Sequence, residues 1–299
     1  MKITLTGSLG HIGLPLTKEL IQKGHSVTVI SSQAAKQKEI EALGAIAAIG
    51  VMEDTGFLTK AFTGADAVYC MVPPPTHATD PDFDTVLHCR QLANNFAEVI
   101  RNTGVKRVIH LSSIGAHMDK HSGLILGHYE IEKTLKAIPG IALTHMRPVG
   151  FYYNLYAFVP VIKHTGAISS NYGGDDRLPW VSPIDIAVAV ADEITTPMIT
   201  GRKIRYVASD EPTCNEIAAA LGAAIGKPDL KWNLISDEQM LSRLESVGLP
   251  KKVAAGLTEM NAAIHTGELS EDYFLHRPKL GNVKIGDFAK EFAVIFNQK

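Results

Sequence analysis

Short apolar runs alternate with amphipathic segments through the first half of the chain. Runs rich in β-branched residues predict strands, and apolar residues spaced three or four apart predict helices. The expected strands are Ile3–Thr6, Ser26–Ser31, Ala45–Gly50, Ala67–Met71, Val108–Ser112 and Ala142–Arg147. The helices expected between them are Ile12–Gln22, Ala34–Leu43, Gly56–Phe62, Phe83–Thr103 and His128–Ala137. This alternation predicts an α/β fold, a doubly wound parallel sheet (Rossmann) with helices on both faces.

The pattern loosens after Pro148, with an aromatic-rich segment over Phe151–Pro160 and a polar one over 166–178. A helix over Pro183–Ile194 and a strand over Lys203–Val207 indicate that the chain then rejoins the sheet. Further helices are expected over Asn215–Ile225, Ser236–Val247, Lys251–Thr266 and near Ile285–Phe296, with an irregular Asp272–Gly281. We therefore expect a dinucleotide-binding domain from residues 1–150 plus about 181–208. The remainder, about 151–180 plus 209–299, is expected to form a smaller, mainly helical C-terminal lobe for a substrate or partner.

Composition narrows the classes of function. The chain has 299 residues and a formal net charge of -2, so it can bury a large core and carries no basic excess that would favour nucleic acid. Cys70, Cys89 and Cys214 lack metal-like spacing, which predicts buried free thiols, no metal site and a reducing, cytoplasmic setting. We find no signal-peptide pattern and no apolar run near the ~20 residues that span a bilayer.

The most informative motif follows the first strand, where glycines recur at every third position. It reads Gly7, Ser8, Leu9, Gly10, His11, Ile12 and Gly13. Between a strand and a helix, the first glycine permits a sharp turn, the second lets a pyrophosphate approach the backbone, and the third allows close helix packing. The G-x-x-G-x-x-G spacing favours the short-chain dehydrogenase branch of dinucleotide-binding folds. A tight turn without a ligand is the competing interpretation.

The end of the second strand bears on cofactor choice. A site selective for NAD places a carboxylate there, which binds the ribose 2′-hydroxyl and repels a 2′-phosphate. Ser31, Ser32 and Gln33 stand there instead, and Lys36 and Lys38 follow. The sequence therefore favours NADP and leaves NAD possible, although two lysines are also typical of a solvated helix face.

The other strand ends supply further candidates, because ligands bind at the carboxyl ends of strands in open sheets. Asp54 suits either the adenine edge or a helix cap. Met71, Val72 and Pro73 are expected beneath the cofactor, with Pro74 toward a substrate, unless these prolines are only a stiff surface loop. After the fifth strand, Ser112 is expected near the cofactor. Ser113 is a weak catalytic candidate there, and His117 a substrate contact.

The helix expected over 128–137 can be oriented in two ways, with either Tyr129 or His128 facing the sheet. Tyr129 and Lys133 have the i, i+4 spacing of the acid/base pair in short-chain dehydrogenases. However, Leu124, Ile131, Leu135 and Ile138 form an apolar stripe that contains His128, whereas Tyr129, Glu132, Lys133 and Lys136 form the polar side. Because one residue turns a helix by ~100°, Tyr129 and His128 cannot both face the sheet. We expect His128 to point inward, either as a core histidine or as a catalytic residue.

Together these residues resemble the NmrA-like group of atypical short-chain dehydrogenases. The resemblance covers nearly the whole chain, through the glycine turn, Leu111–Ser113, His128 with Glu132 and Leu135, Arg147-Pro148 followed by Phe151 and Asn154, Val181–Ala187, and Glu216–Gly222. In that frame His128 stands where other members of the superfamily keep a catalytic lysine, and Leu124 where they keep the tyrosine.

The resemblance implies either of two functions. One is an NAD(P)H-dependent reductase for a quinone-like or other small carbonyl substrate, with Phe151, Tyr152 and Asn154 near that substrate. Phe151, Tyr152 and Tyr153 would then form a flat aromatic wall for it, unless this cluster only packs between the lobes. A quinone accepts hydride directly and takes its proton from solvent, so loss of the Tyr/Lys pair is compatible with this reaction. The alternative is a non-enzymatic redox sensor with a protein partner. A sugar-nucleotide epimerase is disfavoured, since that chemistry usually relies on the missing tyrosine.

Overall fold

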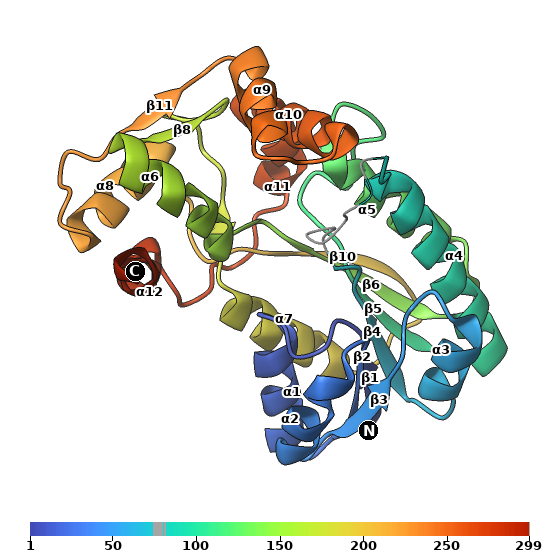
Figure 1. The fold of residues 1–299 in the computed structure, drawn as a ribbon. Coiled ribbons are helices and arrows are strands. Elements are labelled where there is room, and N and C mark those ends of the chain that lie inside the picture. Colours follow the sequence, from blue (N-terminus) through green and yellow to red (C-terminus); the bar gives the residue numbers. More distant parts are fainter. Residues whose placement is uncertain (74–79, 81, 299) are drawn as a thin grey trace.

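The computed structural model describes residues 1–73, 80 and 82–298, and it contains a seven-stranded parallel sheet (Figure 1). The strand order is β10-β6-β5-β4-β1-β2-β3. The sheet strands are β1 (Lys2–Leu5), β2 (Ser26–Ser31), β3 (Ile46–Ile49), β4 (Ala67–Cys70), β5 (Arg107–Leu111), β6 (Ala142–Pro148) and β10 (Gly201–Val207). The order reverses at β1 and β4, so the predicted doubly wound α/β fold is confirmed.

Helices cover both faces of the sheet. One face carries α1 (Gly13–Gln22), α2 (Gln37–Ala42), which follows the short 3-10 segment η1 (Ala34–Lys36), and α7 (Pro183–Thr195). The other carries α3 (Thr55–Phe62), α4 (Thr85–Thr103) and α5 (Leu126–Lys136). Each face has its own apolar core, with Leu16 and Val29 buried on the first and Phe96 and Val108 buried on the second. The apolar periodicity thus predicted every strand of this sheet.

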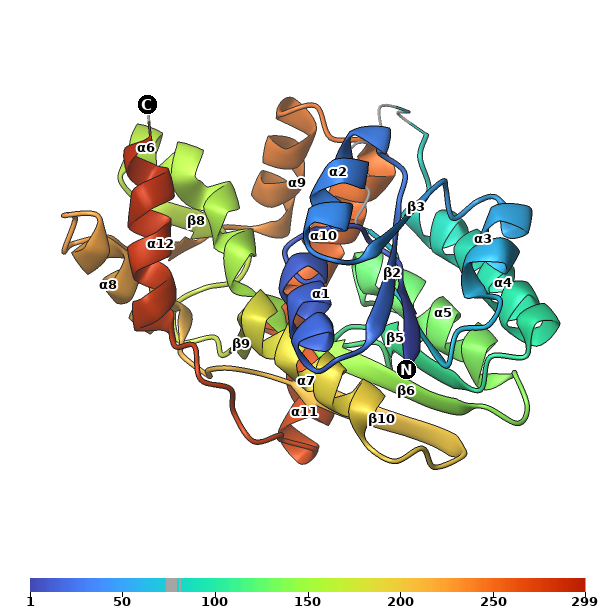
Figure 2. The same cartoon turned by 90° about the horizontal axis from the view of Figure 1, so that it is seen from below.

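The C-terminal part is mainly helical, as predicted, and stands beyond the sheet (Figure 2). Its expected helices are α8 (Cys214–Ala224), α9 (Asp237–Ser246), α10 (Lys251–His265) and α12 (Ile285–Asn297). Sequence periodicity missed η3 (Tyr152–Phe158), α6 (Val159–Thr165) and α11 (Glu271–Leu275). It also missed β7 (Gly150–Phe151) paired with β9 (Trp180–Val181), and β8 (Ile168–Ser170) paired with β11 (Trp232–Leu234). These elements are too short for a periodic signal. The domain boundaries remain a prediction.

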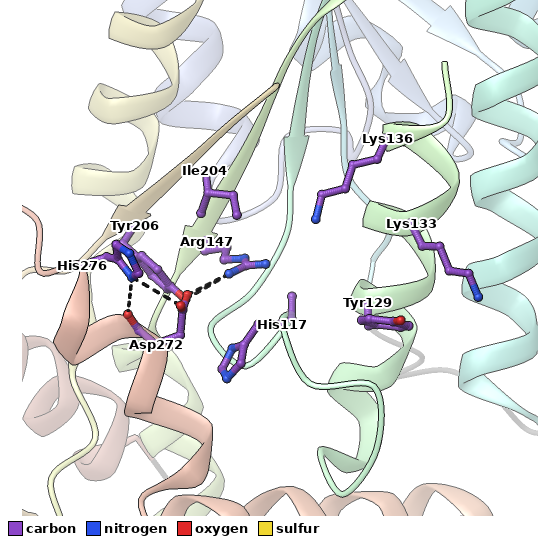
Figure 3. Close-up of a pocket in the computed structure, with 10 residues that line it drawn as sticks. His117, Tyr129, Lys133, Lys136, Arg147, Ile204, Tyr206, Asp272 and His276 are labelled. Carbon is purple, nitrogen blue, oxygen red and sulfur yellow. Dashed lines mark hydrogen bonds and ion pairs between the residues drawn. The ribbon is translucent and has the colours of Figure 1, made fainter. Parts of the chain in front are cut away.

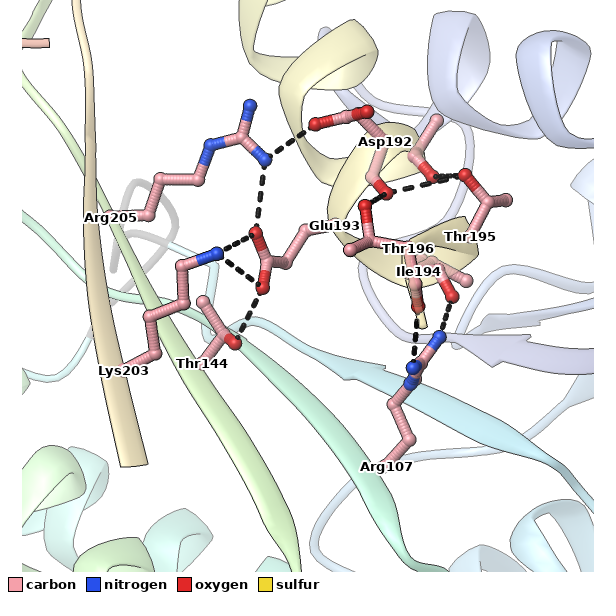
Figure 4. Close-up of polar contacts among 10 residues, drawn as sticks. Arg107, Thr144, Asp192, Glu193, Ile194, Thr195, Thr196, Lys203 and Arg205 are labelled. Atoms are coloured by element: carbon pink, nitrogen blue, oxygen red, sulfur yellow. Dashed lines mark hydrogen bonds and ion pairs between the residues drawn. The ribbon is translucent and has the colours of Figure 1, made fainter. Parts of the chain in front are cut away.

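Polar contacts anchor α7 to three strands of the sheet, β5, β6 and β10 (Figure 4). The Arg107 guanidinium, at the start of β5, donates to the carbonyl oxygens of Ile194 and Thr196 at the end of α7. A cation at this end of a helix satisfies free carbonyls and the helix dipole together. On the same helix, Glu193 accepts hydrogen bonds from Thr144 of β6 and from Lys203 and Arg205 of β10. Because α7 also packs on α1, this anchoring steadies the helix that follows the glycine turn.

The C-terminal part contacts the sheet domain at several places. The Asp185 carboxylate accepts hydrogen bonds from Ser209 Oγ and from the backbone amides of Asn282 and Val283, at 2.5, 3.2 and 3.1 Å. Elsewhere α10 lies against η2 (Gly123–Ile125), the segment that leads into α5. A Cβ on Gly123 would overlap the carbonyl oxygen of Gly256 in α10. The two backbones therefore touch without intervening side chains.

The structure also bears on the compositional predictions. Cys70, Cys89 and Cys214 are free and buried, as expected. Within residues 1–73, 80 and 82–298, no group of histidine, cysteine and acidic side chains has an arrangement that could hold a metal ion. Over the same residues, no helix is both long and apolar enough to cross a membrane.

Candidate active site

The glycine turn between β1 and α1 is held in place by its neighbours. Gly7 has a φ of +92°, and a Cβ there would lie 2.5 Å from Met71 Sδ. Ser8 also has a positive φ, and its hydroxyl donates to Ser31 Oγ at 3.0 Å. A Cβ on Gly13 would overlap the carbonyl oxygen of Ser8. Gly7 and Gly13 are thus required by the backbone itself, while Leu9 and Ile12 are buried in the core.

Gly10 differs from these two glycines because it faces open space. It is exposed, and a Cβ there would meet only the Gly7 carbonyl oxygen, at 3.5 Å. Beyond it, α1 begins without a side-chain cap and without an acidic residue in its first turn. The positive end of the helix is therefore left for an anion. An open glycine beside an uncapped helix start fits the pyrophosphate of a dinucleotide.

The end of β2 presents neutral polar groups beside this turn. Ser31 is buried and its hydroxyl is held by Ser8, while Ser32 and Gln33 are exposed. Lys36 is paired with Glu39 at 2.7 Å. No carboxylate stands at the strand end itself, which fits a 2′-phosphate. Asp54, left open between two roles, caps α3 by accepting a hydrogen bond from the Phe57 amide.

The end of β4 lies against the glycine turn. The Thr6 hydroxyl donates to the Met71 carbonyl at 3.1 Å and accepts from the Met71 amide at 2.8 Å. Val72 is half-buried and Pro73 is exposed. Pro74, predicted toward the substrate, lies outside the described residues. The structure thus brings Met71 and its neighbours beside the turn, as a shared cofactor site requires.

Ser112 needs a correction. We expected it at the cofactor, but its side chain is buried at 1% exposure and its hydroxyl donates to Glu132 Oε1 at 2.6 Å. That hydroxyl is therefore held in the buried contact with Glu132 beneath α5 and does not point toward the expected cofactor. Ser113, the next residue, is half-buried and stands outside this contact.

The inward direction of His128 on α5 is confirmed, whereas the expected position of Glu132 is wrong. The Nδ1 atom of His128 is buried, and the ring lies 6.2 Å from that of His110 on β5. Burial lowers the pKa of His128 to about 4, so its imidazole is neutral at pH 7. Glu132, assigned to the polar side with Tyr129 and Lys133, is 1% exposed. A buried carboxylate is tolerated here because it is paired.

Its partners form an ion-pair network that sequence reasoning missed. Arg147, on β6, binds Glu132 through Nε and Nη2, each at 2.8 Å, and Lys136 binds Glu132 Oε2 at 2.8 Å. Burial acts to raise the pKa of Glu132, but Arg147, His145 and Lys136 outweigh it and hold that pKa well below its usual range. The sequence did contain one sign of this network, the charged Arg147 within an otherwise apolar strand, because such a charge requires a buried partner.

The three aromatic residues expected to form a wall differ in burial. Tyr152 is 1% exposed and stacks between Trp180 and Phe288, so its ring mainly packs in the core, and its contact with a substrate stays a prediction. Phe151 and Tyr153 are partly exposed and lie 5.1 Å apart. The Tyr153 ring also stacks on His11 of the glycine turn at 4.4 Å. The wall therefore consists of Phe151 and Tyr153, and it adjoins the cofactor turn.

Two remaining substrate candidates lie apart from each other. Asn154 is exposed on η3, next to the aromatic wall. His117 lines a cavity together with Tyr129 and Arg147, on the side of α5 that faces β6 and β10 (Figure 3). The structure thus places His117 away from the inward stripe of α5, and it does not bring His117 together with His128.

A parallel sheet of this order, with a glycine turn between β1 and α1, defines a Rossmann-type dinucleotide-binding protein. The chain belongs to the NmrA-like family, whose sequence profile matches residues 1–274. The resemblance inferred from the motifs is therefore confirmed.

Known relatives share this length and fold. The chain is 25% identical to NAD(P)H azoreductase of Xenophilus azovorans, over 87% of this chain and 86% of that protein. It is 25% identical to quinone oxidoreductase 2 of Escherichia coli, over 90% of each. Among solved structures, the NADPH complex of an NADPH-dependent quinone oxidoreductase from E. coli superposes with a TM-score of 0.78. That match has 23% identity and covers 99% of this chain and 100% of the other. Triphenylmethane reductase of Citrobacter sp. gives 0.81 at 20% identity, over 98% and 100%.

Proposed function

We propose that this protein is an NADPH-dependent reductase that passes hydride to a quinone-like acceptor. The observation that carries the proposal is the open face of the glycine turn at Gly10, beside a helix start with no cap and no acid. Two relatives support the reaction class, since one is an NAD(P)H azoreductase and the other a quinone oxidoreductase.

The residues at the strand ends support NADPH over NADH. Ser32 and Gln33 offer neutral donors and acceptors near the expected ribose, and the strand end carries no negative charge. When bound, NADPH supplies the hydride. Met71, Val72 and Pro73 form the floor beneath its expected position, and Phe151 with Tyr153 offers a flat apolar wall to a planar acceptor.

We assign His128 a binding role. Its neutral imidazole offers hydrogen bonds to the nicotinamide end or to the acceptor, and it holds no spare proton at pH 7 to act as an acid. The proton that completes reduction therefore comes from solvent. Ser113, at the end of β5, is the hydroxyl that remains available for the same end of the cofactor.

The test combines cofactor binding with turnover. Purified protein is mixed anaerobically with NADPH and a panel of quinones while absorbance at the nicotinamide band is followed. Loss of that absorbance with formation of quinol supports the reductase. Tight NADPH binding without turnover on any quinone would instead support the sensor.

A glycine substitution ties the result to the proposed site. Gly10→Val should abolish NADPH binding in calorimetry, because its Cβ would meet only the Gly7 carbonyl oxygen, in ordinary contact at 3.5 Å, and the side chain would otherwise fill the expected place of the pyrophosphate. Gly286→Val is the matched control, since Gly286 is exposed on α12 and nothing lies within 4 Å of its Cβ position. A folded Gly10→Val protein with unchanged affinity would refute the site.

A further inference from the structure

The cavity that His117 lines lies on the far side of α5 from α4 (Figure 3). Its volume is about 590 Å³, a size typical of pockets that hold small organic ligands. One side is the outer stripe of α5, with Tyr129, Lys133 and Lys136. The other side is formed by β6, β10 and α11, and His117 comes from the loop after β5.

This cavity is separate from the glycine turn. In the sheet, β5 and β4 stand between β6 and β1, and no residue of the glycine turn lines the cavity. On α5, Tyr129 and Lys133 each follow the inward His128 and Glu132 by one residue, about 100° around the helix, whereas Lys136 follows Glu132 by one turn. The proposed cofactor site and this cavity are therefore reached from adjacent sides of one helix.

The charges around the cavity favour an anion. Three cations, Lys133, Lys136 and Arg147, line it. Three carboxylates, Glu132, Asp272 and Glu271, lie around it, but only Asp272 is among the lining residues, so the lining itself carries three cations against one carboxylate. Glu132 is buried beneath the wall, where it holds Arg147 and Lys136. An entering ligand thus meets ammonium and guanidinium groups before it meets that carboxylate.

The one carboxylate in the lining is already engaged. Asp272 Oδ2 accepts hydrogen bonds from Arg147 Nη1 at 3.0 Å and from the Tyr206 hydroxyl. Its other oxygen lies 3.3 Å from His276 Nδ1. Burial lowers the pKa of His117, so its imidazole is neutral and can hydrogen-bond a ligand without adding charge. Its neighbours therefore partly neutralise Asp272, and cations outnumber carboxylates among the lining residues.

The rest of the lining is apolar. The rings of Tyr129 and Tyr206 stand on opposite sides, and Ile204 on β10 is 45% exposed toward the same space. We propose that this cavity binds an organic monoanion, a carboxylate or sulfonate carried on an aromatic or aliphatic body. The acid group pairs with Lys136 above Arg147, with Lys133 as a more distant positive charge at the rim, and the body packs between the tyrosine rings and Ile204. This inference is independent of the proposed reductase activity.

The experiment uses naphthalene-1-sulfonate as the probe, titrated by calorimetry into the full chain without NADPH. Ile204→Glu places a carboxylate in the cavity wall, and Ile204→Gln is its uncharged counterpart of the same size. Position 204 is exposed on an edge strand, so both variants should fold. We expect Ile204→Glu to bind the probe at least about tenfold more weakly than Ile204→Gln. The reason is that repulsion between two like charges a few ångströms apart changes a dissociation constant by about that factor. Lys133→Gln should weaken binding several-fold.

Two results would overturn the proposal. Equal affinity of the Ile204→Glu and Ile204→Gln proteins would mean that the probe binds elsewhere. Displacement of the probe by saturating NADPH or by a quinone would place it in the cofactor cleft. NADPH binding is measured on the same three variants and should match wild type. Failure of the reductase proposal and failure of this one are thereby distinguished.

Discussion

Three buried histidines between the sheet and α5 should make the stability of this protein fall as the solution becomes mildly acidic. His110 and His145 lie on neighbouring strands with their Nδ1 atoms 3.0 Å apart, and His128 packs against His110. Burial lowers the pKa of all three, to about 4 for His128 and for His145. The charged groups that face this cluster are Glu132, Lys136, Arg147 and Arg202.

The sign follows from proton linkage. An unfolded chain has imidazole pKa values near 6.5, so below that pH it binds protons that the folded chain does not. The stability that the neutral histidines contribute is therefore fully present above about pH 6.5 and is lost as the pH falls toward 4. For His145, which is fully buried, linkage gives a loss of about 2 kcal/mol between pH 8 and pH 5. Glu132 adds nothing in this window, because its pKa is held well below its usual range.

The assay is urea denaturation of wild type and of His145→Gln, at pH 8 and at pH 5. The variant should lose less stability across this range, by about 2 kcal/mol, whatever its packing defect costs at pH 8. His164→Gln, at an exposed position, should leave the pH dependence of wild type unchanged. If His145→Gln and wild type lose the same free energy between the two pH values, the imidazole is not held neutral in the fold and the reasoning is refuted.

Three further predictions follow from the site. NADP(H) should bind at least as tightly as NAD(H) in parallel titrations, since no carboxylate at the end of β2 repels a 2′-phosphate; a clear NAD(H) preference would contradict this. Tyr129→Phe should leave reductase activity within a few-fold of wild type, while His128→Ala weakens nicotinamide or acceptor binding, compared at matched stability. A rate loss of roughly 10²–10⁴ confined to Tyr129→Phe would restore the tyrosine mechanism. Arg147→Met should cost about 3–5 kcal/mol in urea denaturation, because it leaves the Glu132 carboxylate buried with less compensation; a change under about 1 kcal/mol would speak against that ion pair.

The strands and long helices were predictable because burial imposes a local pattern on them. The run from Ser26 to Ser31 and the strand that begins at Ala67 each stand between two helical segments along the chain, and this alternation of strand and helix places both in a parallel sheet. The glycine turn was predictable for a similar reason, since Gly7 and Gly13 are required by the backbone next to them.

The errors arose where one side chain depends on another that is distant in the sequence. Glu132 was placed on the polar face because a carboxylate is usually exposed, and only pairing with Arg147 makes its burial possible. Tyr152 and Tyr153 are neighbours in one aromatic run, and the positions of Trp180 and Phe288 decide which ring is buried. No local pattern contains that information.

The contact between Gly123 and Gly256 has an evolutionary consequence. The two glycines are far apart in the sequence, yet a side chain on Gly123 would overlap the Gly256 backbone, and a side chain on Gly256 would overlap the Leu124 side chain next to Gly123. A substitution that enlarges Gly123 cannot be compensated at Gly256, because that position already carries the smallest residue. Gly123 therefore cannot change to a larger residue while α10 stays docked at this depth, whereas a larger residue at Gly256 requires the Leu124 side chain to move or shrink. Descendants of this chain must keep Gly123, or α10 must settle farther from the segment that leads into α5.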